Sequence, residues 1–258
     1  MLRKLNNLRG FTIAATDGEI GKVDDFYFED DSWALRYMVV DTGPWILGRQ
    51  VLISPIAIDA VDWEAQVLSV HLTKEKVKNS PAIGEAQPVS RQHEIALHDY
   101  YGWPGYWYPA PAMTAPMGGM YAVPIPPQVA LDEESEKATA TEVEEAGDPH
   151  LRSLREVINY HIHATDDHIG HVQDFFADEN DWRIRYLLVD TRNWLPGRHV
   201  LIGTDWVEQI DWAERDVIVK VTKAQVENSP EYDPHAPVTR AYEEHLYANY
   251  EMPGYWFM

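Results

Sequence analysis

Residues 17–41 read DGEIGKVDDFYFEDDSWALRYMVVD, and residues 166–190 read DDHIGHVQDFFADENDWRIRYLLVD. Both stretches contain an acidic turn, an apolar-rich run, a tryptophan and a second apolar run that ends in aspartate. Trp33 recurs as Trp182, and Asp41 recurs as Asp190, which is a shift of 149 positions in both cases. This self-similarity indicates a duplicated domain.

The repeat continues without a gap on both sides of these stretches, so that Leu2–Trp107 aligns with Leu151–Trp256. We expect three segments: residues 1–107 as a first domain with its tail, 108–150 as a connection, and 151–258 as a second domain with its tail. The connection is rich in Pro, Ala, Gly and Met and then acidic, which predicts a flexible linker. Its Ile125-Pro126-Pro127 stretch leaves open a polyproline docking peptide.

Within each copy the spacing of apolar residues indicates short β-strands. Thr12–Thr16 and Ile20–Phe28 flank Asp17-Gly18, a dipeptide that favours a hairpin turn. In the last expected strand of each copy, apolar residues occupy every second position, which predicts a row of side chains that faces the core. These rows are Leu68, Val70 and Leu72 in the first copy, and Val217, Val219 and Val221 in the second.

Several short strands at close spacing predict a mainly β chain with two small closed barrels, because closure removes exposed sheet edges. After each barrel, Thr73 and Thr222 are typical N-caps of a short helix. Each copy then ends in an aromatic tail.

The net charge of −21 argues against nucleic acid and against an anionic membrane surface as partners, since the 21 basic residues do not cluster in the sequence. The chain has no cysteine, which excludes thiolate catalysis and Cys-ligated zinc. We find no signal peptide and no apolar run of about 20 residues that would span a membrane. These features predict a cytoplasmic protein without a cofactor.

The order of these motifs resembles the PRC-barrel family, which is named after the H subunit of the photosynthetic reaction centre and a 16S ribosomal RNA processing factor. The resemblance rests on the hairpin Asp17–Phe26, Trp33, Arg36–Asp41 and Arg49–Pro55, together with the equivalent residues of the second copy. The resemblance covers roughly the first 75 residues of each copy. It implies a six-stranded barrel that serves docking and assembly rather than catalysis.

Charged residues shared by both copies are the first candidates for a site. They could form an anion-binding site near Trp45 and Trp194, or they could be ion pairs that the fold requires. These residues are Asp25, Arg36, Asp41 and Arg49 in the first copy, and Asp174, Arg185, Asp190 and Arg198 in the second.

Histidines in the second copy are the next candidates. His161 and His163 lie two apart on an expected strand, and His168 and His171 flank the adjacent turn. Four imidazoles on one hairpin could bind zinc, nickel or copper, or they could be solvated or pH-sensitive surface residues.

The aromatic tails are the last candidates, because Trp and Tyr dominate interface hot spots. Each tail could cover its own barrel or contact a partner. The candidate interface residues are Trp103, Tyr106, Trp107, Tyr255, Trp256 and Phe257.

No nucleophile, phosphate-binding or dinucleotide motif is present, so we expect no enzymatic activity. The sequence favours a scaffold or adaptor that binds another protein or itself. Two alternatives are a peripheral subunit of a photosynthetic or electron-transport complex, and a metal- or small-ligand-binding protein that uses the histidine hairpin.

Overall fold

The computed structural model describes residues 1–46, 48–81, 89–107, 151–191, 194 and 198–257. The predicted linker, with its Ile125-Pro126-Pro127 stretch, lies outside the described residues. The chain divides into two compact units, of which one combines Met1–Asn79 with His150–Met258, and the other is Ser80–Pro149. The first unit therefore contains the strands of both copies.

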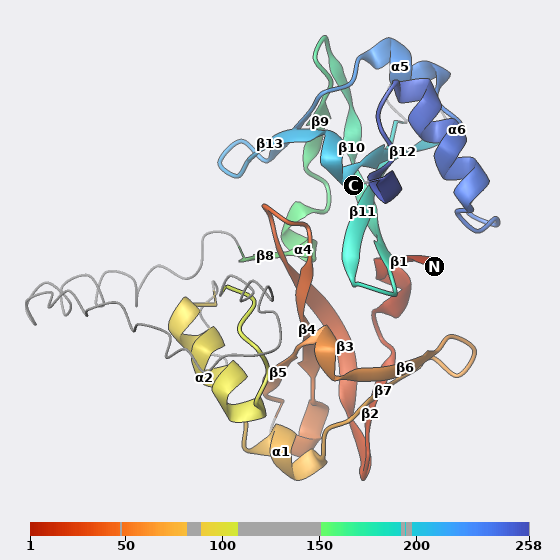
Figure 1. Cartoon of the computed structure of the whole chain (residues 1–258). Coiled ribbons are helices and arrows are strands. Elements are labelled where there is room, and N and C mark those ends of the chain that lie inside the picture. The colour runs from red at the N-terminus through yellow and green to blue at the C-terminus, as the bar shows by residue number, and fades with distance from the viewer. Residues whose placement is uncertain (47, 82–88, 108–150, 192–193, 195–197, 258) are drawn as a thin grey trace, which may run out of the picture. The chain divides into compact units, whose positions relative to one another are not determined.

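Strands dominate the first unit (Figure 1). In the first copy they are β1 (Leu2–Lys4), β2 (Thr12–Ala15), β3 (Gly18–Glu29), β4 (Leu35–Asp41), β5 (Gln50–Ile53), β6 (Ile58–Asp62) and β7 (Val67–Val70), followed by helix α1 (Lys74–Lys78). In the second copy they are β8 (Leu151–Ser153), β9 (His161–His163), β10 (His168–Asp178), β11 (Arg183–Asp190), β12 (His199–Gly203), β13 (Val207–Asp211) and β14 (Asp216–Val219), with helices α4 (Leu154–Val157), α5 (Lys223–Asn228) and α6 (Arg240–Tyr250).

The two copies build sheets of the same order, β5-β4-β3-β2-β7-β6 and β12-β11-β10-β9-β14-β13. In each sheet the strand that opens the copy's hairpin also pairs in parallel with the last strand, as β2 does with β7. The expected core row is confirmed, because Leu68, Val70 and Leu72 and their three counterparts are all at most 3 % exposed. The prediction of a mainly β chain with two barrel-like domains is thus confirmed.

Closure of the barrels is not observed. In the described part of the chain no ladder joins the two ends of either sheet, β5 with β6 or β12 with β13. A short 3-10 turn, Pro55–Ala57, separates β5 from β6 and redirects the chain there. Pro55 at its start has no N–H to donate to a ladder. The prediction of closed barrels is therefore wrong for the described residues, in which both sheets remain open.

The sequence did not predict that the copies exchange their first strands. β1 pairs antiparallel with β10, so that Leu2 lies opposite Asp178. In the reciprocal contact, β8 pairs antiparallel with β3, and Ser153 lies opposite Tyr27. Each copy therefore supplies the seventh strand of the other copy's sheet.

The pairs β1 with β10 and β8 with β3 form the contact between the copies, called the seam from here on, and two tryptophans also lie in it. The carbonyl of Trp182 accepts a hydrogen bond from the Leu35 amide at 2.8 Å, and the carbonyl of Trp33 accepts one from Ile184 at 2.8 Å. Trp33 and Trp182 have φ values of 58° and 54°, which bulky side chains rarely adopt. The reciprocal backbone bonds hold both residues in this left-handed conformation.

Helices α1 and α5 are fixed by the same device in both copies. Thr73 and Thr222 are confirmed as N-caps, because their side chains accept from the amides of Lys76 and Gln225. The turns before β3 and β10 add a second cap, in which Asp17 accepts from the Lys74 amide at 2.7 Å and Asp166 accepts from the Lys223 amide at 2.8 Å. The turn that opens each long strand is thereby tied to the helix that ends the barrel.

The second unit contains helix α2 (Arg91–Tyr101), which begins at the N-cap Ser90 and ends at Gly102. Gly102 has a φ of 76°, the left-handed value that terminates many helices. None of the helices in the described residues is long and apolar enough to span a membrane.

Candidate functional site

Asp25 and Asp174 occupy equivalent places at the seam between the copies. Asp25 is buried, receives a hydrogen bond from the Ser153 hydroxyl of the exchanged strand, and pairs with Arg9 at 2.7 Å. Asp174 is also buried and accepts from the amides of Phe175 at 2.8 Å and Asn6 at 3.2 Å. Burial raises the pKa of Asp174. Both carboxylates thus anchor the strand that arrives from the other copy.

The remaining shared charges lie at separate places. Arg36 pairs with Glu29, and Arg185 pairs with Asp181, both beside the turn that carries the seam tryptophan. Arg49 donates to the Lys78 carbonyl and Arg198 to the Glu227 carbonyl.

These carbonyls end α1 and α5, where a positive charge is favourable. Asp41 accepts from the Gly43 amide at 2.8 Å, and the buried Asp190 lies 3.7 Å from His171. The structure therefore distributes the eight predicted charges over structural contacts and does not gather them around Trp45 and Trp194.

The second aromatic tail lies on its own barrel. Glu243 of α6 is buried and accepts hydrogen bonds from Tyr186 of β11 and from Tyr255, both at 2.8 Å. The ring of Trp206 lies 4.5 Å from that of Tyr250. Burial and the adjacent Glu243 carboxylate raise the pKa of Tyr255 to about 12. Helix α6 is therefore a covering element of the second barrel.

The end of this tail is less enclosed. Trp256 is only partly buried, with its ring 4.9 Å from Tyr247 and 4.2 Å from the Arg240 guanidinium carbon. Phe257 follows it with 82 % of its surface exposed. The enclosed aromatic residues of this segment are instead Tyr247 and Tyr250 of α6.

The first aromatic tail folds onto its own helix within the second unit. Tyr106 donates to Glu94 of α2 at 2.5 Å. Trp103 stacks on Tyr101 with ring centroids 4.2 Å apart, and the Trp107 ring lies 4.8 Å from that of His98. The three candidate residues of this tail are therefore brought together on one helix.

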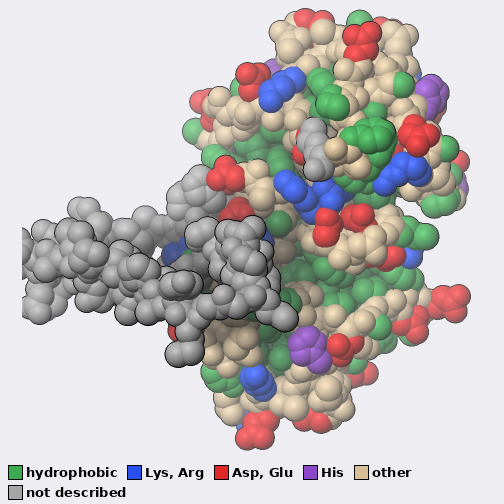
Figure 2. Space-filling model, in the orientation of Figure 1, with side chains coloured by type: hydrophobic (Ala, Val, Ile, Leu, Met, Phe, Trp, Pro, Cys, Tyr) green, Lys and Arg blue, Asp and Glu red, His purple; other side chains and the backbone are tan. Residues whose placement is uncertain are grey.

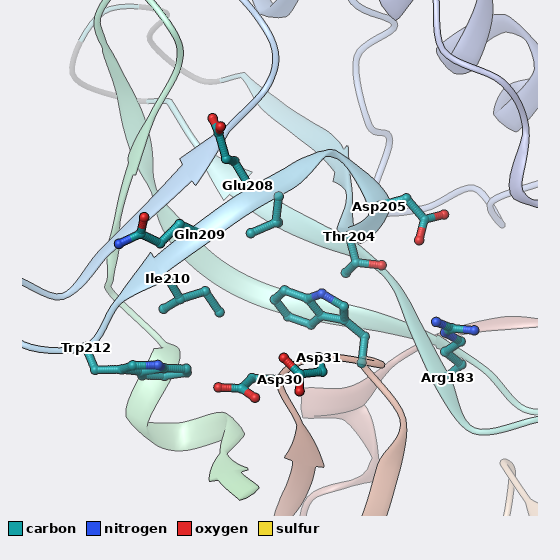
Figure 3. A pocket seen from close by; sticks show the side chains of 11 residues that line it. Asp30, Asp31, Arg183, Thr204, Asp205, Glu208, Gln209, Ile210 and Trp212 are labelled. Carbon is teal, nitrogen blue, oxygen red and sulfur yellow. The ribbon is translucent and has the colours of Figure 1, made fainter. Parts of the chain in front are cut away.

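Sequence reasoning missed a cavity of about 330 Å³ at the seam. Its lining combines the carboxylates of Asp30, Asp31, Asp205 and Glu208 with the indoles of Trp33 and Trp212. Figure 3 shows Asp30 and Asp31 on the same side as Trp212, while Asp205 lies towards Thr204 and Arg183. The acidic pair of the first copy was visible in the sequence, but its partners on β13 could be found only from the fold.

A comparison with models of protein families shows to which family this chain belongs. The model of the PRC-barrel domain matches residues 2–76 and 149–226, which together make more than half of the chain. The protein belongs to the PRC-barrel family. No curated protein matches the chain.

The four candidate histidines all lie on the second PRC barrel, and three of them cluster. His168 Nε2 lies 3.3 Å from His161 Nδ1, and the rings of His168 and His163 are 5.2 Å apart. His171 points instead towards Asp190. Among the described residues, no group of three or more His, Cys, Asp or Glu side chains is arranged to hold a metal ion.

The histidine cluster predicts a pH-dependent stability of the second PRC barrel. Partial burial and the neighbouring His163 and His161 lower the pKa of His168, against smaller opposite effects of Asp167 and Asp216. In the unfolded chain the same imidazole titrates near its ordinary pKa of about 6.5. The unfolded state therefore binds more protons as the pH falls through that value, and stability is lost on acidification.

We expect His168→Gln to reduce the fall in melting temperature between pH 7.5 and pH 5.5, measured by circular dichroism. His235→Gln is the matched control, because His235 is exposed and outside the cluster. Equal pH dependence of wild type and His168→Gln would contradict the assignment of the effect to this cluster.

Proposed function

We propose that this tandem PRC-barrel protein is a non-catalytic cytoplasmic adaptor that holds a protein partner at its C-terminal aromatic tail. The observation that carries the proposal is the exposed Phe257 beside the partly buried Trp256, in a 3-10 turn that follows helix α6 on the barrel. Aromatic side chains on a rigid support lose little conformational entropy on binding, which suits an interface anchor.

The support of the tail is well defined. Glu243 receives two tyrosine hydroxyls, and Arg240 lies over the Trp256 ring while it pairs with Glu243 at 3.2 Å. The last turn, Tyr255–Phe257, is therefore held in place by polar contacts beneath it. The tail thus exposes the apolar side chain of Phe257, while the polar side chains of Glu243 and Arg240 beneath it are paired within the chain.

The net charge of the protein restricts the chemical class of partner that it can bind. The visible face carries scattered acidic side chains on both copies and, among the described residues, no continuous basic patch (Figure 2). With a net charge of −21, the protein attracts basic surfaces and repels nucleic acids. We therefore propose a protein rather than a nucleic acid as the partner, with an apolar pocket for Phe257. The alternative of a photosynthetic or electron-transport subunit rests on the family alone.

The test is site-specific crosslinking in native cell extract with a photoreactive phenylalanine analogue at position 257. We expect one dominant adduct of defined mass. The matched control carries the analogue at Ile56, an exposed apolar residue of the first copy that is 51 % exposed. Identical adduct patterns at the two positions, or no adduct at position 257, would contradict the proposal, and the mass of the adduct identifies the partner.

A further inference from the structure

The seam joins two parts of the chain that are far apart in the sequence. β1 of the first copy adds to β10, and β8 of the second copy adds to β3. These two ladders, and the two backbone bonds of Trp33 and Trp182, are related by the shift of 149 positions. A contact in which both sides use the same surface is isologous, as in dimers with twofold symmetry. The seam therefore has the form of an interface between two molecules.

Apolar side chains of both copies are removed from water at the seam. Leu2 and Leu151, which open the exchanged strands, are both buried. Phe28 and Phe175 are also buried and approach each other across the seam. Separation of the copies would expose these side chains to water, so that the hydrophobic effect favours the paired state.

The charged contacts across the seam differ between its two ends. At the end formed by β1, Lys4 Nζ lies 3.7 Å from Asp174 Oδ2 of the second copy. At the end formed by β8, Arg155 Nη2 donates to Asp24 Oδ1 of the first copy at 2.8 Å. The cation thus comes from the first copy at one end and from the second copy at the other.

The counterparts of these charged residues in the other copy carry no charge. The same holds for Arg9, which pairs with Asp25 in the first copy. By the shift of 149 positions, the uncharged counterparts are Ser153 for Lys4, Asn6 for Arg155, Gln173 for Asp24 and Ile158 for Arg9. The two copies are therefore complementary to each other rather than to themselves.

A seam between two second copies would leave the buried Asp174 without a cation. Burial raises the pKa of Asp174, whereas Lys4 and Arg9 of the first copy are among the groups that lower it. In a pair of second copies, Ser153 and Ile158 would occupy the places of these two cations. A buried carboxylate without a cation is costly, which disfavours this pair.

A seam between two first copies is disfavoured for another reason. Asn6 would take the place of Arg155 opposite Asp24, so that this ion pair would be lost. Lys4 would join Arg9 at Asp25, which places two cations at one carboxylate. Complementary charge determines which partners associate, because wrong pairs bring like charges together. The contacts of the seam thus favour a first copy with a second copy.

We propose that the seam is a protein–protein interface that does not require the connection between the copies, and that it pairs a first copy with a second copy. Its partner is then the other copy of the same chain or the complementary copy of a second chain. Two chains that exchange copies in this way form a closed dimer that keeps every contact of the seam. The seam uses no residue of the aromatic tail Tyr255–Phe257, so that loss of either surface leaves the other intact.

The test uses the full chain with a protease recognition sequence inserted between Ala130 and Leu131 of the connection. After cleavage, size-exclusion chromatography with light scattering at 1 µM protein is expected to give the mass of the uncut chain. Unlabelled and nitrogen-15-labelled cleaved protein are then mixed for one day at 37 °C and measured by native mass spectrometry. We expect hybrids of one labelled and one unlabelled half, each with one first and one second copy.

Substitutions at the seam test the charge complementarity, with affinities of the cleaved halves from sedimentation over a dilution series. Lys4→Ser is expected to weaken the association at least about tenfold, because Asp174 stays buried with less positive charge near it. Adding Asp174→Asn to Lys4→Ser removes that carboxylate and is expected to restore most of the affinity. Arg155→Gln, at the other end of the seam, provides a second variant if Lys4→Ser fails to fold.

The matched control is Lys220→Ser, the same change at an exposed position of the second copy outside the seam. It is expected to leave the affinity unchanged. The proposal is overturned if the wild-type halves separate at 1 µM, if no hybrids form, or if pairs of two second copies are as abundant as mixed pairs. Equal affinities of the control and of the seam variants would likewise overturn it.

Discussion

Replacement of Phe28 by alanine is expected to lower the free energy of unfolding by about 3–5 kcal/mol and to shift the melting of both copies together. Phe28 of β3 is fully buried, and its ring centroid lies 6.2 Å from that of Phe175 on β10 of the other copy. A cavity at this place removes contacts from both sheets. For a chain of this size the loss corresponds to roughly 10 °C in melting temperature.

Differential scanning calorimetry measures this outcome. We expect a single transition in the wild type and in Phe28→Ala, because the exchanged strands couple the two sheets. Ile56→Ala, at an exposed position, is the control and is expected to leave the transition in place. A thermogram of Phe28→Ala that splits, with its upper transition at the wild-type temperature, would show that the copies unfold independently.

Substitution of Gly170 by alanine is expected to be similarly destabilising, by about 3 kcal/mol or more. A Cβ atom at Gly170 would lie 2.2 Å from the Asp190 carbonyl oxygen, and the residue has a φ of 142°. The neighbouring atom is backbone, so that β10 and β11 would have to separate. Gly21 in the first copy has the same 2.2 Å approach, to the Asp41 carbonyl oxygen.

Gly10→Ala separates the steric effect from backbone strain. Gly10 has a φ of 84°, but the space that an added methyl group would occupy has no neighbouring atom within 4 Å, so its substitution should cost only about 1–2 kcal/mol. Urea unfolding of the two variants provides the comparison. If Gly170→Ala is no less stable than Gly10→Ala, the close approach of the two strands does not limit stability.

The duplication and the core rows could be predicted because they depend on local pattern. Val217, Val219 and Val221 alternate with Asp216, Ile218 and Lys220, and a period of two leaves one face for the core. The caps Thr73 and Thr222 are local for the same reason. Such features do not depend on which other segment a strand meets.

The strand exchange could not be predicted in this way. Leu2–Lys4 and Leu151–Ser153 have the same short pattern whether they pair within a copy or across copies. The left-handed tryptophans have no signal either, because Trp33 is stabilised by a backbone bond from Ile184 on the other copy. Open sheets replaced the predicted closed barrels for a related reason, since pairing at the sheet ends depends on the three-dimensional path.

The candidate sites could likewise be predicted only where the local sequence pattern determines them. The histidines were correctly placed on one hairpin, because strand periodicity and the turn bring His161, His163 and His168 together. The shared arginines and aspartates were grouped only because both copies have them, and each serves a different local contact. The seam cavity joins residues of both copies, so that neither copy alone contains it.

The exchange of first strands makes this chain resemble a homodimer whose two subunits have become covalently joined. In a true homodimer every substitution is present twice, and both corners of the interface must change together. A single chain removes that constraint, so that Arg3 can pair with Glu179 of the other copy while its counterpart Arg152 pairs with Glu156 of its own copy. The fused pair can thereby change one corner of the contact between its copies without changing the other.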